Sequence, residues 1–265
     1  MFRLTREVRF ASNSASEPLP DRPVTNAYAS YPSLTGLGHY FALGVTIAGD
    51  LNPASNYLLN IKDIDQAVRR LAIPLVEQTV RHQPTQFGAP LLTQLFDRLE
   101  NAWPTAILET LNLSLSPFLS LSILSSERPM TRLSQKFEFA ASHRLHNPAL
   151  SDEQNRQTFG KCNNPHGHGH NYELQVTLAG APNPSGLLFD IPTFEETVAR
   201  TIIDRFDHKN LNIEVTEFAA LIPSVENIAR VIYRLLKPKL QSDTTRLAGV
   251  TVWETPKTWC EYSEE

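Results

Sequence analysis

The sequence is poor in cysteine, with Cys162 and Cys260 as its two examples among 265 residues. Two cysteines in a chain of this length do not make the disulfide framework of small secreted proteins. Residues 1–10 hold three arginines and no apolar segment, so they do not have the pattern of a secretory signal. We therefore expect reduced thiols and a cytoplasmic location.

An excess of positive charge is also missing, because the net charge is −4 and the isoelectric point is about 6.1. Without a basic patch we expect no nucleic-acid partner. No uninterrupted apolar run approaches the roughly 18 residues of a membrane helix, so we expect no membrane partner. Hydrophobic residues make up 41% of the chain, which is enough for a core, and the length suits one large domain or two ordinary ones.

The chain contains a long internal repeat. Residues 36–49 align without a gap on residues 167–180. Both copies then continue to an Asn-Pro pair and to a proline before an expected helix, at Asn52-Pro53, Asn183-Pro184, Pro84-Thr85 and Pro223-Ser224. The shared order and spacing predict two domains of one fold, with a boundary in the polar segment 126–132.

Each half predicts the same series: strand, long loop, strand, two helices and a closing two-stranded hairpin. In the second half, residues 171–178 alternate between apolar and polar, which is typical of a half-buried antiparallel strand. Phe194, Val198 and Ile202 recur at helical spacing, and Ser224 is a candidate N-cap for a second helix. The pattern predicts an α+β fold, with a four-stranded antiparallel sheet and two helices in each domain.

Three histidines are expected to point toward the same buried side of two strands. His168 and His170 are two apart, so their side chains share one face with Tyr172. His143 continues the apolar parity of the preceding strand, residues 137–141. Three imidazoles with an open fourth position suit a catalytic zinc, and hydrogen-bonded core histidines are the alternative. His166 could reach the same face, and we interpret it as an outer group.

Cys162 lies in a loop six residues before His168. A thiol beside zinc, with Lys161 adjacent, could have a lowered pKa and act as a base or nucleophile. A structural cysteine is the alternative reading of this spacing. For Cys260, between Trp259 and Glu261 in the last strand, we favour the structural role.

Two acidic features complete the candidate site. Asp207 beside His208 could fix an imidazole tautomer for proton transfer, although charged residues at a helix end are also common. Glu254 ends the inward-facing stripe of Val250 and Val252, so its carboxylate needs a partner. A ring with adjacent N–H and NH₂ donors would pair with it, and an internal Arg or Lys is the competing partner.

The second half resembles the family of 6-pyruvoyl-tetrahydropterin and 6-carboxy-tetrahydropterin synthases over nearly all of residues 135–265. The segments that carry the resemblance are 139–145, 150–155, 159–172, 207–211, 224–227, 253–255 and 262–264. The resemblance implies a tunnelling fold (T-fold), whose units assemble their strands into a barrel with active sites between subunits. It therefore implies a homo-oligomer, which for a tandem chain suggests a trimer or a multiple of it.

The resemblance also implies roles for the candidate residues. His143, His168 and His170 would be Zn²⁺ ligands, and Cys162 would be a proton-abstracting thiolate. Asp207 and His208 would be a partner pair that comes from a neighbouring subunit. Glu254 and Glu226 would contact the pterin. The implied enzyme is a carbon–oxygen lyase that converts 7,8-dihydroneopterin triphosphate to 6-pyruvoyl-tetrahydropterin and eliminates triphosphate. Two departures from the family pattern, His166 and Val225, touch none of these roles.

Two alternatives remain open. Five residues separate Cys162 from His168, as in the pyruvoyl enzymes, but three separate it from His166, as in the carboxy enzymes. A 6-carboxy-tetrahydropterin synthase of the queuosine pathway, which releases acetaldehyde and triphosphate, is therefore the first alternative. A non-catalytic pterin-binding or assembly protein is the second.

The first half is expected to lack this chemistry. Leu37 aligns with His168, His39 with His170, and Asn13 or Ser14 with His143, while Phe87 falls opposite Glu226. No cysteine occurs in residues 1–130, and one imidazole cannot hold a catalytic zinc. We predict a degenerate, non-catalytic domain at residues 1–128 and a catalytic domain at residues 129–265.

Overall fold

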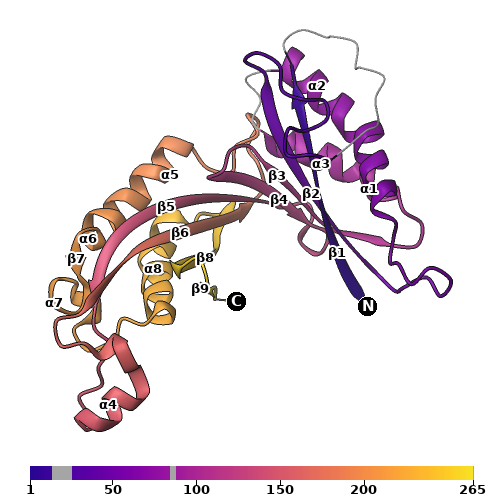
Figure 1. Cartoon of the computed structure of the whole chain (residues 1–265). Helices are drawn as coiled ribbons and strands as arrows, with labels where there is room; N and C mark the ends of the chain where they lie inside the picture. The colour runs from indigo at the N-terminus through magenta and orange to yellow at the C-terminus, as the bar shows by residue number, and fades with distance from the viewer. Residues whose placement is uncertain (14–25, 84–87, 265) are drawn as a thin grey trace. The chain divides into compact units, whose positions relative to one another are not determined.

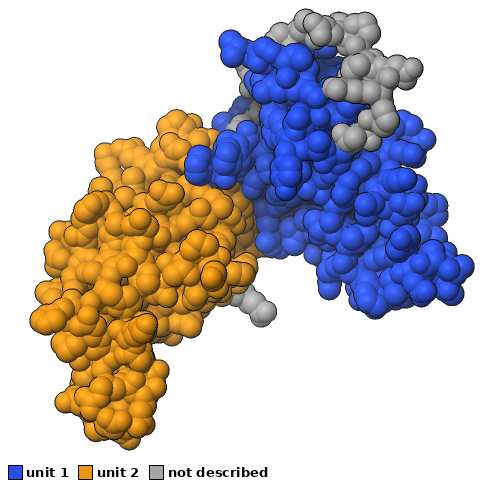
Figure 2. All heavy atoms as spheres, viewed as in Figure 1, with its two compact units in different colours: residues 1–133, 180–188 blue, residues 134–179, 189–265 orange. Residues whose placement is uncertain are grey.

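The computed structural model describes residues 1–13, 26–83 and 88–264 (Figure 1). It divides into two compact units, which Figure 2 shows in different colours. Unit 1 comprises Met1–Leu133 with Gly180–Leu188, and unit 2 comprises Ser134–Ala179 with Phe189–Glu265. No helix in the described part of the chain is long and apolar enough to span a membrane. Ser14, Pro84, Thr85 and Phe87, which the sequence comparison singled out, lie outside the described residues.

Unit 1 is built on four antiparallel strands in the order β1-β2-β3-β4. Their bounds are β1 Phe2–Ser12, β2 His39–Gly49, β3 Ile107–Ser114 and β4 Leu119–Leu124. The helical segments are α1 Ile61–Ala67, the π-helical η1 Val68–Ala72, α2 Ile73–His82, α3 Gly88–Leu99 and the 3₁₀ turn η2 Ser125–Glu127. Val8, Leu43 and Leu113 are cross-strand neighbours in this sheet and fully buried, as period-two alternation requires.

Unit 2 repeats this plan, with strands in the order β5-β6-β8-β9 and a short β7 that pairs in parallel with β5. The strands are β5 Thr131–His143, β6 His168–Gly180, β7 Lys209–Asn210, β8 Thr245–Thr255 and β9 Thr258–Tyr262. The helical segments are α4 Asp152–Phe159, η3 Gly160–Asn163, α5 Ile191–Val198, η4 Ala199–Ile203, α6 Asp204–Phe206, α7 Leu211–Glu214, η5 Thr216–Phe218 and α8 Val225–Leu240. The α+β class is therefore confirmed.

The predicted core faces are also confirmed. Tyr172, Leu174, Val176 and Leu178 of β6 are at most 1% exposed, while the residues between them are not buried. Phe194, Val198 and Ile202 are fully buried along α5 and η4. The Ser224 side chain accepts a hydrogen bond from the Asn227 amide at the start of α8, as expected of an N-cap.

Helix α4 was not predicted, because it lies where the sequence suggested a long loop. Asn155 is its one buried residue, so it has no apolar periodicity for a pattern to detect. It is stabilised instead by a capping box, in which Ser151 bonds the Gln154 amide and Gln154 bonds back to the Ser151 amide. Asn155 also donates to the Asn147 carbonyl, which ties the helix to the segment after β5.

The repeat found in the sequence recurs in the backbone. Gly36 and Gly167 both have positive φ, +59° and +74°, before β2 and β6 respectively. Asn52 and Asn183 cap equivalent turns after those strands through their side-chain oxygens. Each unit also has a π-helical segment directly after a helix that follows its second strand, η1 after α1 and η4 after α5. These features support the interpretation that the two halves share one fold.

Candidate metal and active site

The structure brings three histidines of unit 2 together. His143 is the last residue of β5, and His168 and His170 begin β6. One nitrogen from each ring lies within 4.8 Å of the others, and Nε2 of His143 is 3.1 Å from Nε2 of His168. The rings are as close as 4.5 Å between centroids. The strand parity that predicted this meeting is therefore confirmed in the geometry.

His143 is held most firmly of the three. Its side chain is fully buried, and its Nδ1 lies 2.7 Å from the carbonyl oxygen of Pro223. Since a carbonyl only accepts, Nδ1 carries the proton and Nε2 keeps its lone pair. Burial lowers the pKa of His143 to about 4, with smaller contributions from His168 and His170, so the ring is neutral near pH 7. A neutral imidazole whose lone pair has a fixed direction can bind a metal through that nitrogen.

The residues present fit a zinc ion. Two tetrahedral zinc ligands at about 2.0–2.1 Å place their nitrogens about 3.3 Å apart, close to the 3.1 Å between His143 and His168. Nε2 of His170 is buried without a hydrogen-bond partner, and so is Nδ1 of His168. Buried polar atoms without partners are costly, and a metal would satisfy the orphaned nitrogen of His170. The group can therefore hold a metal with three imidazoles and an open fourth position.

Glu254 approaches the same point from β8. Its Oε1 lies 3.4 Å from Nε2 of His143 and 3.7 Å from Nε2 of His170, and its side chain is 19% exposed. The inward direction predicted from Val250 and Val252 is confirmed by this contact. Burial lowers the pKa of His170, and the Glu254 charge opposes that shift. A carboxylate beside three imidazoles can contact a metal or a substrate bound there.

Cys162 lies on the 3₁₀ turn η3, close enough to Glu254 for the two to interact electrostatically. Burial raises the pKa of its thiol, and the negative charge of Glu254 raises it further. The prediction that the protein's own side chains lower the thiol pKa of Cys162 is therefore wrong. The adjacent Lys161 is exposed and does not offset the effects of burial and Glu254. A lowered thiol pKa requires a cation that the side chains do not supply.

The sequence did not reveal the segment that holds Cys162 in place. Immediately after His143, Leu145 donates its amide to the Cys162 carbonyl at 2.9 Å, and Nε of Arg144 donates to the Asn163 carbonyl at 3.2 Å. Asn212 then bonds both the amide and the carbonyl of Arg144, at 2.7 and 3.0 Å. These bonds link the thiol turn to the strand end that carries the first candidate ligand.

Asp207 and His208 form the predicted pair. Oδ2 of Asp207 accepts from Nδ1 of His208 at 2.8 Å, and Oδ1 accepts from the Ala140 amide at 2.7 Å. The Ala140 bond and then the His208 bond hold the pKa of Asp207 below its usual range. His208 has a positive φ of 57° and an 83% exposed side chain, so its Nε2 is free to meet another molecule. His208 and His170 both line a surface hollow of about 510 Å³.

Two other candidates lie apart from the histidines. His166 is exposed and does not join the three-histidine group, in agreement with its interpretation as an outer residue. Glu226 is exposed in the first turn of α8, and its charge acts on Cys260, whose pKa is raised mainly by burial. The contact of Glu226 with a pterin thus stays a prediction.

In unit 1 the equivalent positions carry a different set of residues. Ser12 ends β1 as His143 ends β5, and the offset of 131 residues that relates His39 to His170 also relates these two, so Ser12 rather than Asn13 or Ser14 lies opposite His143. Ser12 is buried and pairs across the sheet with His39. Leu37, opposite His168, is 99% exposed. The described residues of unit 1 therefore offer one imidazole where unit 2 offers three.

The fold and the histidine group together define an α+β protein with three histidines that could hold a metal ion, and sequence comparisons agree with both. Residues 132–265 match the family model described as 6-pyruvoyl tetrahydropterin synthase. Because this match spans half of the chain, the chain belongs to the 6-pyruvoyl tetrahydropterin synthase family.

Individual relatives match the same half. A 6-pyruvoyl tetrahydrobiopterin synthase of Homo sapiens is 38% identical over 139 residues, which cover 52% of this chain and 94% of the relative. The Drosophila melanogaster protein of that name is 39% identical, over 52% of this chain and 82% of the relative. A 6-carboxy-5,6,7,8-tetrahydropterin synthase of Haemophilus influenzae is 29% identical over 51% of this chain and 100% of the relative.

Among solved structures, 6-pyruvoyl tetrahydropterin synthase of Caenorhabditis elegans is 37% identical to this chain, with a TM-score of 0.49. It matches 52% of this chain and 97% of that chain. Taken with the family model, the sequence relatives indicate an enzyme of the 6-pyruvoyl tetrahydropterin synthase type.

Proposed function

We propose that unit 2 catalyses the zinc-dependent conversion of 7,8-dihydroneopterin triphosphate to 6-pyruvoyl-tetrahydropterin, with elimination of triphosphate. The observation that carries the proposal is the convergence of three imidazoles within 4.8 Å beside Glu254, whose charge also acts on the thiol of Cys162. The site lies in the half that the family model covers. A lyase of this type needs a metal, a proton carrier and a pterin anchor, and residues for each role are present.

The three imidazoles would hold the metal. Zinc held there would supply Lewis-acid chemistry, which would make a C–H beside a substrate hydroxyl more acidic and stabilise the negative charge that its deprotonation leaves. His143 is oriented for this role by Pro223, which fixes the proton on Nδ1. The buried, unpartnered Nε2 of His170 supplies a second lone pair at the same point.

The other side chains would bind the ring and move protons. Cys162 would take the proton from carbon as the thiolate, which a cation bound by the histidines would favour, and the loop bonds from Leu145 and Arg144 hold its turn in position. Asp207 keeps His208 protonated on Nδ1, so the exposed Nε2 is the nitrogen that exchanges protons. Glu254 accepts from adjacent ring N–H and NH₂ donors in a bidentate pair.

We propose that residues 1–128 form a non-catalytic domain and residues 129–265 the catalytic one. Unit 1 has Ser12 and Leu37 in the positions of two ligands, and its described residues include no cysteine. A role in packing or assembly is compatible with these substitutions. If each domain docks as a subunit of the family, three chains supply six T-fold units.

The proposal is tested by incubating the zinc-loaded full chain with 7,8-dihydroneopterin triphosphate and identifying the product by mass spectrometry. We expect the pyruvoyl product and free triphosphate. Cys162→Ala should form no product and should keep the zinc content of the parent protein. Cys260→Ala is the matched control and should retain activity, because Cys260 lies on β9 and is not part of the three-histidine group.

Other outcomes decide between the alternatives. A carboxy product with acetaldehyde would assign the reaction of a 6-carboxy-tetrahydropterin synthase, the name that the Haemophilus influenzae relative carries. Bound pterin without any product would favour the non-catalytic reading. Loss of zinc from Cys162→Ala would show that the thiol is a ligand, contrary to its assigned role.

A further inference from the structure

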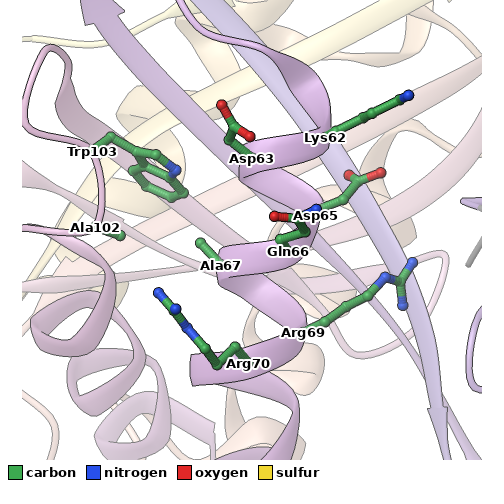
Figure 3. A pocket seen from close by; sticks show the side chains of 9 residues that line it. All are labelled: Lys62, Asp63, Asp65, Gln66, Ala67, Arg69, Arg70, Ala102 and Trp103. Carbon is green, nitrogen blue, oxygen red and sulfur yellow. The ribbon is translucent and has the colours of Figure 1, made fainter.

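Unit 1 contains a cavity of about 840 Å³ that lies between α1, η1 and the loop after α3. Figure 3 shows Asp63, Ala67 and Arg70 along one side of the helix, facing Ala102 and Trp103. Lys62 and Arg69 point to the other side. A volume of this size is within the range of small-molecule sites in proteins. The cavity is far from unit 2 in sequence and shares no residue with the candidate active site.

The cavity has one carboxylate and one guanidinium available for a ligand. Asp63 and Arg70 are exposed, and neither forms an ion pair or a side-chain hydrogen bond within the described part of the chain. Two of the neighbouring charges are engaged elsewhere, because Asp65 is bonded by Arg6 at 2.8 Å and Arg69 donates to the Tyr31 carbonyl. Lys62 points to the other side of the helix. Asp63 and Arg70 are about two turns apart, so the two charges mark opposite ends of the hollow.

Trp103 provides an independent sign of a missing partner. The residue is 4% exposed, and its Nε1 is buried without a hydrogen-bond acceptor. Figure 3 shows the edge of the indole ring that carries the nitrogen turned toward the helix of Asp63 and Ala67. A buried N–H without an acceptor costs free energy, and this one lies on the side of the ring that faces the helix. Between the two charges, Ala67 and Trp103 line the cavity.

The carboxylate in this cavity is not inherited from the shared fold. The helices of the two units begin after equivalent N-caps, Asn60 and Asp190, so Thr193 is the counterpart of Asp63. The Thr193 hydroxyl donates to its own N-cap, Asp190, at 2.6 Å and offers no charge to a ligand. Unit 1 thus has a charged feature that the unit with the histidines does not have.

We propose that this cavity binds a small, flat zwitterion whose guanidinium- or amidinium-type end pairs with Asp63 and whose carboxylate pairs with Arg70. Both pairs can be bidentate, which fixes the orientation of the ligand along the helix. The flat middle of the ligand lies along the cavity wall that Ala67 and Trp103 form. The site is independent of the reaction proposed for unit 2.

The test uses 4-guanidinobenzoate as the probe, in calorimetric titration of the zinc-loaded full chain. We expect one site per chain with a Kd of about 1 mM or tighter, which ordinary ligand efficiency gives for a probe of this size. Asp63→Asn and Arg70→Gln should each weaken binding by about tenfold or more, because each removes one charged pair. Arg81→Gln, an exposed arginine of α2 outside the cavity, is the matched control and should leave the Kd unchanged.

Benzoate and phenylguanidine separate the zwitterion from a single-charge ligand. We expect each to bind at least about tenfold more weakly than 4-guanidinobenzoate, since each can form only one of the two charged pairs. No saturable binding of the probe up to about 10 mM would overturn the proposal, since that is about ten times the expected Kd. Equal weakening by Arg81→Gln, or retained affinity in both cavity variants, would overturn it as well.

Discussion

The carbonyl oxygen of Pro223 accepts a 2.7 Å hydrogen bond from Nδ1 of His143. Pro223 directly precedes the Ser224 N-cap of α8, and His143 ends β5, so the bond joins the start of a helix to the end of a strand. It sets the tautomer of the imidazole and leaves Nε2 facing His168. The packing of α8 thereby prepares a candidate metal ligand that lies 80 residues earlier in the sequence.

Metal binding should stabilise the protein through the three histidines. At a zinc concentration about 100 times its Kd, linkage adds about 2.7 kcal/mol to the free energy of unfolding and raises Tm. His168→Gln should abolish this zinc-dependent shift in a thermal melt and lower the zinc content. His166→Gln should keep both, because His166 is exposed and outside the group. Stoichiometric zinc in His168→Gln would contradict the ligand assignment.

The metal-free protein should lose stability on mild acidification. The pKa of His143 is about 4 in the folded state and about 6.5 in the unfolded state, so between these values the unfolded chain binds more protons. The free energy of unfolding therefore falls as the pH drops from about 6.5 toward 4, by roughly 3 kcal/mol for His143 over the full window. Urea titrations of the zinc-free protein across this range measure the effect.

A variant without the imidazole separates this contribution from other groups. His143→Gln should show a shallower decline over the same pH window, even if its stability at pH 7 is lower. An equally steep decline in the variant would assign the acid sensitivity to other residues.

The charge of Glu254 should affect the pKa of the Cys162 thiol. Its charge raises the thiol pKa in addition to burial, so Glu254→Gln should lower that pKa in the zinc-free protein. The pH dependence of iodoacetamide labelling, followed on separate peptides by mass spectrometry, measures each cysteine. Glu226→Gln is the matched control, because it should lower the pKa of Cys260 and leave Cys162 unchanged. An unaltered Cys162 profile in Glu254→Gln would mean that burial alone sets its pKa.

Asn212 should affect turnover without affecting zinc. Asn212→Ala removes two hydrogen bonds to the backbone of Arg144. The Arg144 side chain in turn bonds the Asn163 carbonyl and so holds the turn of Cys162. Because small misplacements of a reacting group are costly, we expect kcat to fall by about ten- to a hundredfold at constant zinc content. Asn52→Ala removes two comparable backbone bonds in unit 1 and should leave kcat unchanged. Equal loss in both variants would indicate a general effect of stability.

The assembly is expected to be a trimer or a multiple of it. Three chains of 29.8 kDa give a mass of about 90 kDa in light scattering coupled to size exclusion. A monomer mass would contradict both the trimer and the expectation, drawn from the family resemblance, that active sites form between subunits.

Much of the fold could be predicted from periodicity. Alternation in residues 171–178 located β6 and its buried face, and helical spacing located the helix of Phe194 and Val198. Helix α4 could not be predicted from periodicity, because it is stabilised by a capping box and by the polar side chain of Asn155, and neither produces a hydrophobic repeat in the sequence. The π-helical segments η1 and η4 were not predicted, because one extra residue in a helical turn changes the spacing of the apolar residues too little for periodicity to detect.

The sequence by itself determined which residues could form the site, because strand parity puts His143, His168 and His170 on one face and the internal repeat shows that unit 1 has a single counterpart, His39. The tertiary structure alone decided what those residues can do. The tautomer of His143 depends on Pro223, and the raised thiol pKa of Cys162 depends on burial and on Glu254. These effects arise between groups that are far apart in the chain. A local sequence pattern does not show which distant groups lie close enough to change a pKa through their charge or through burial.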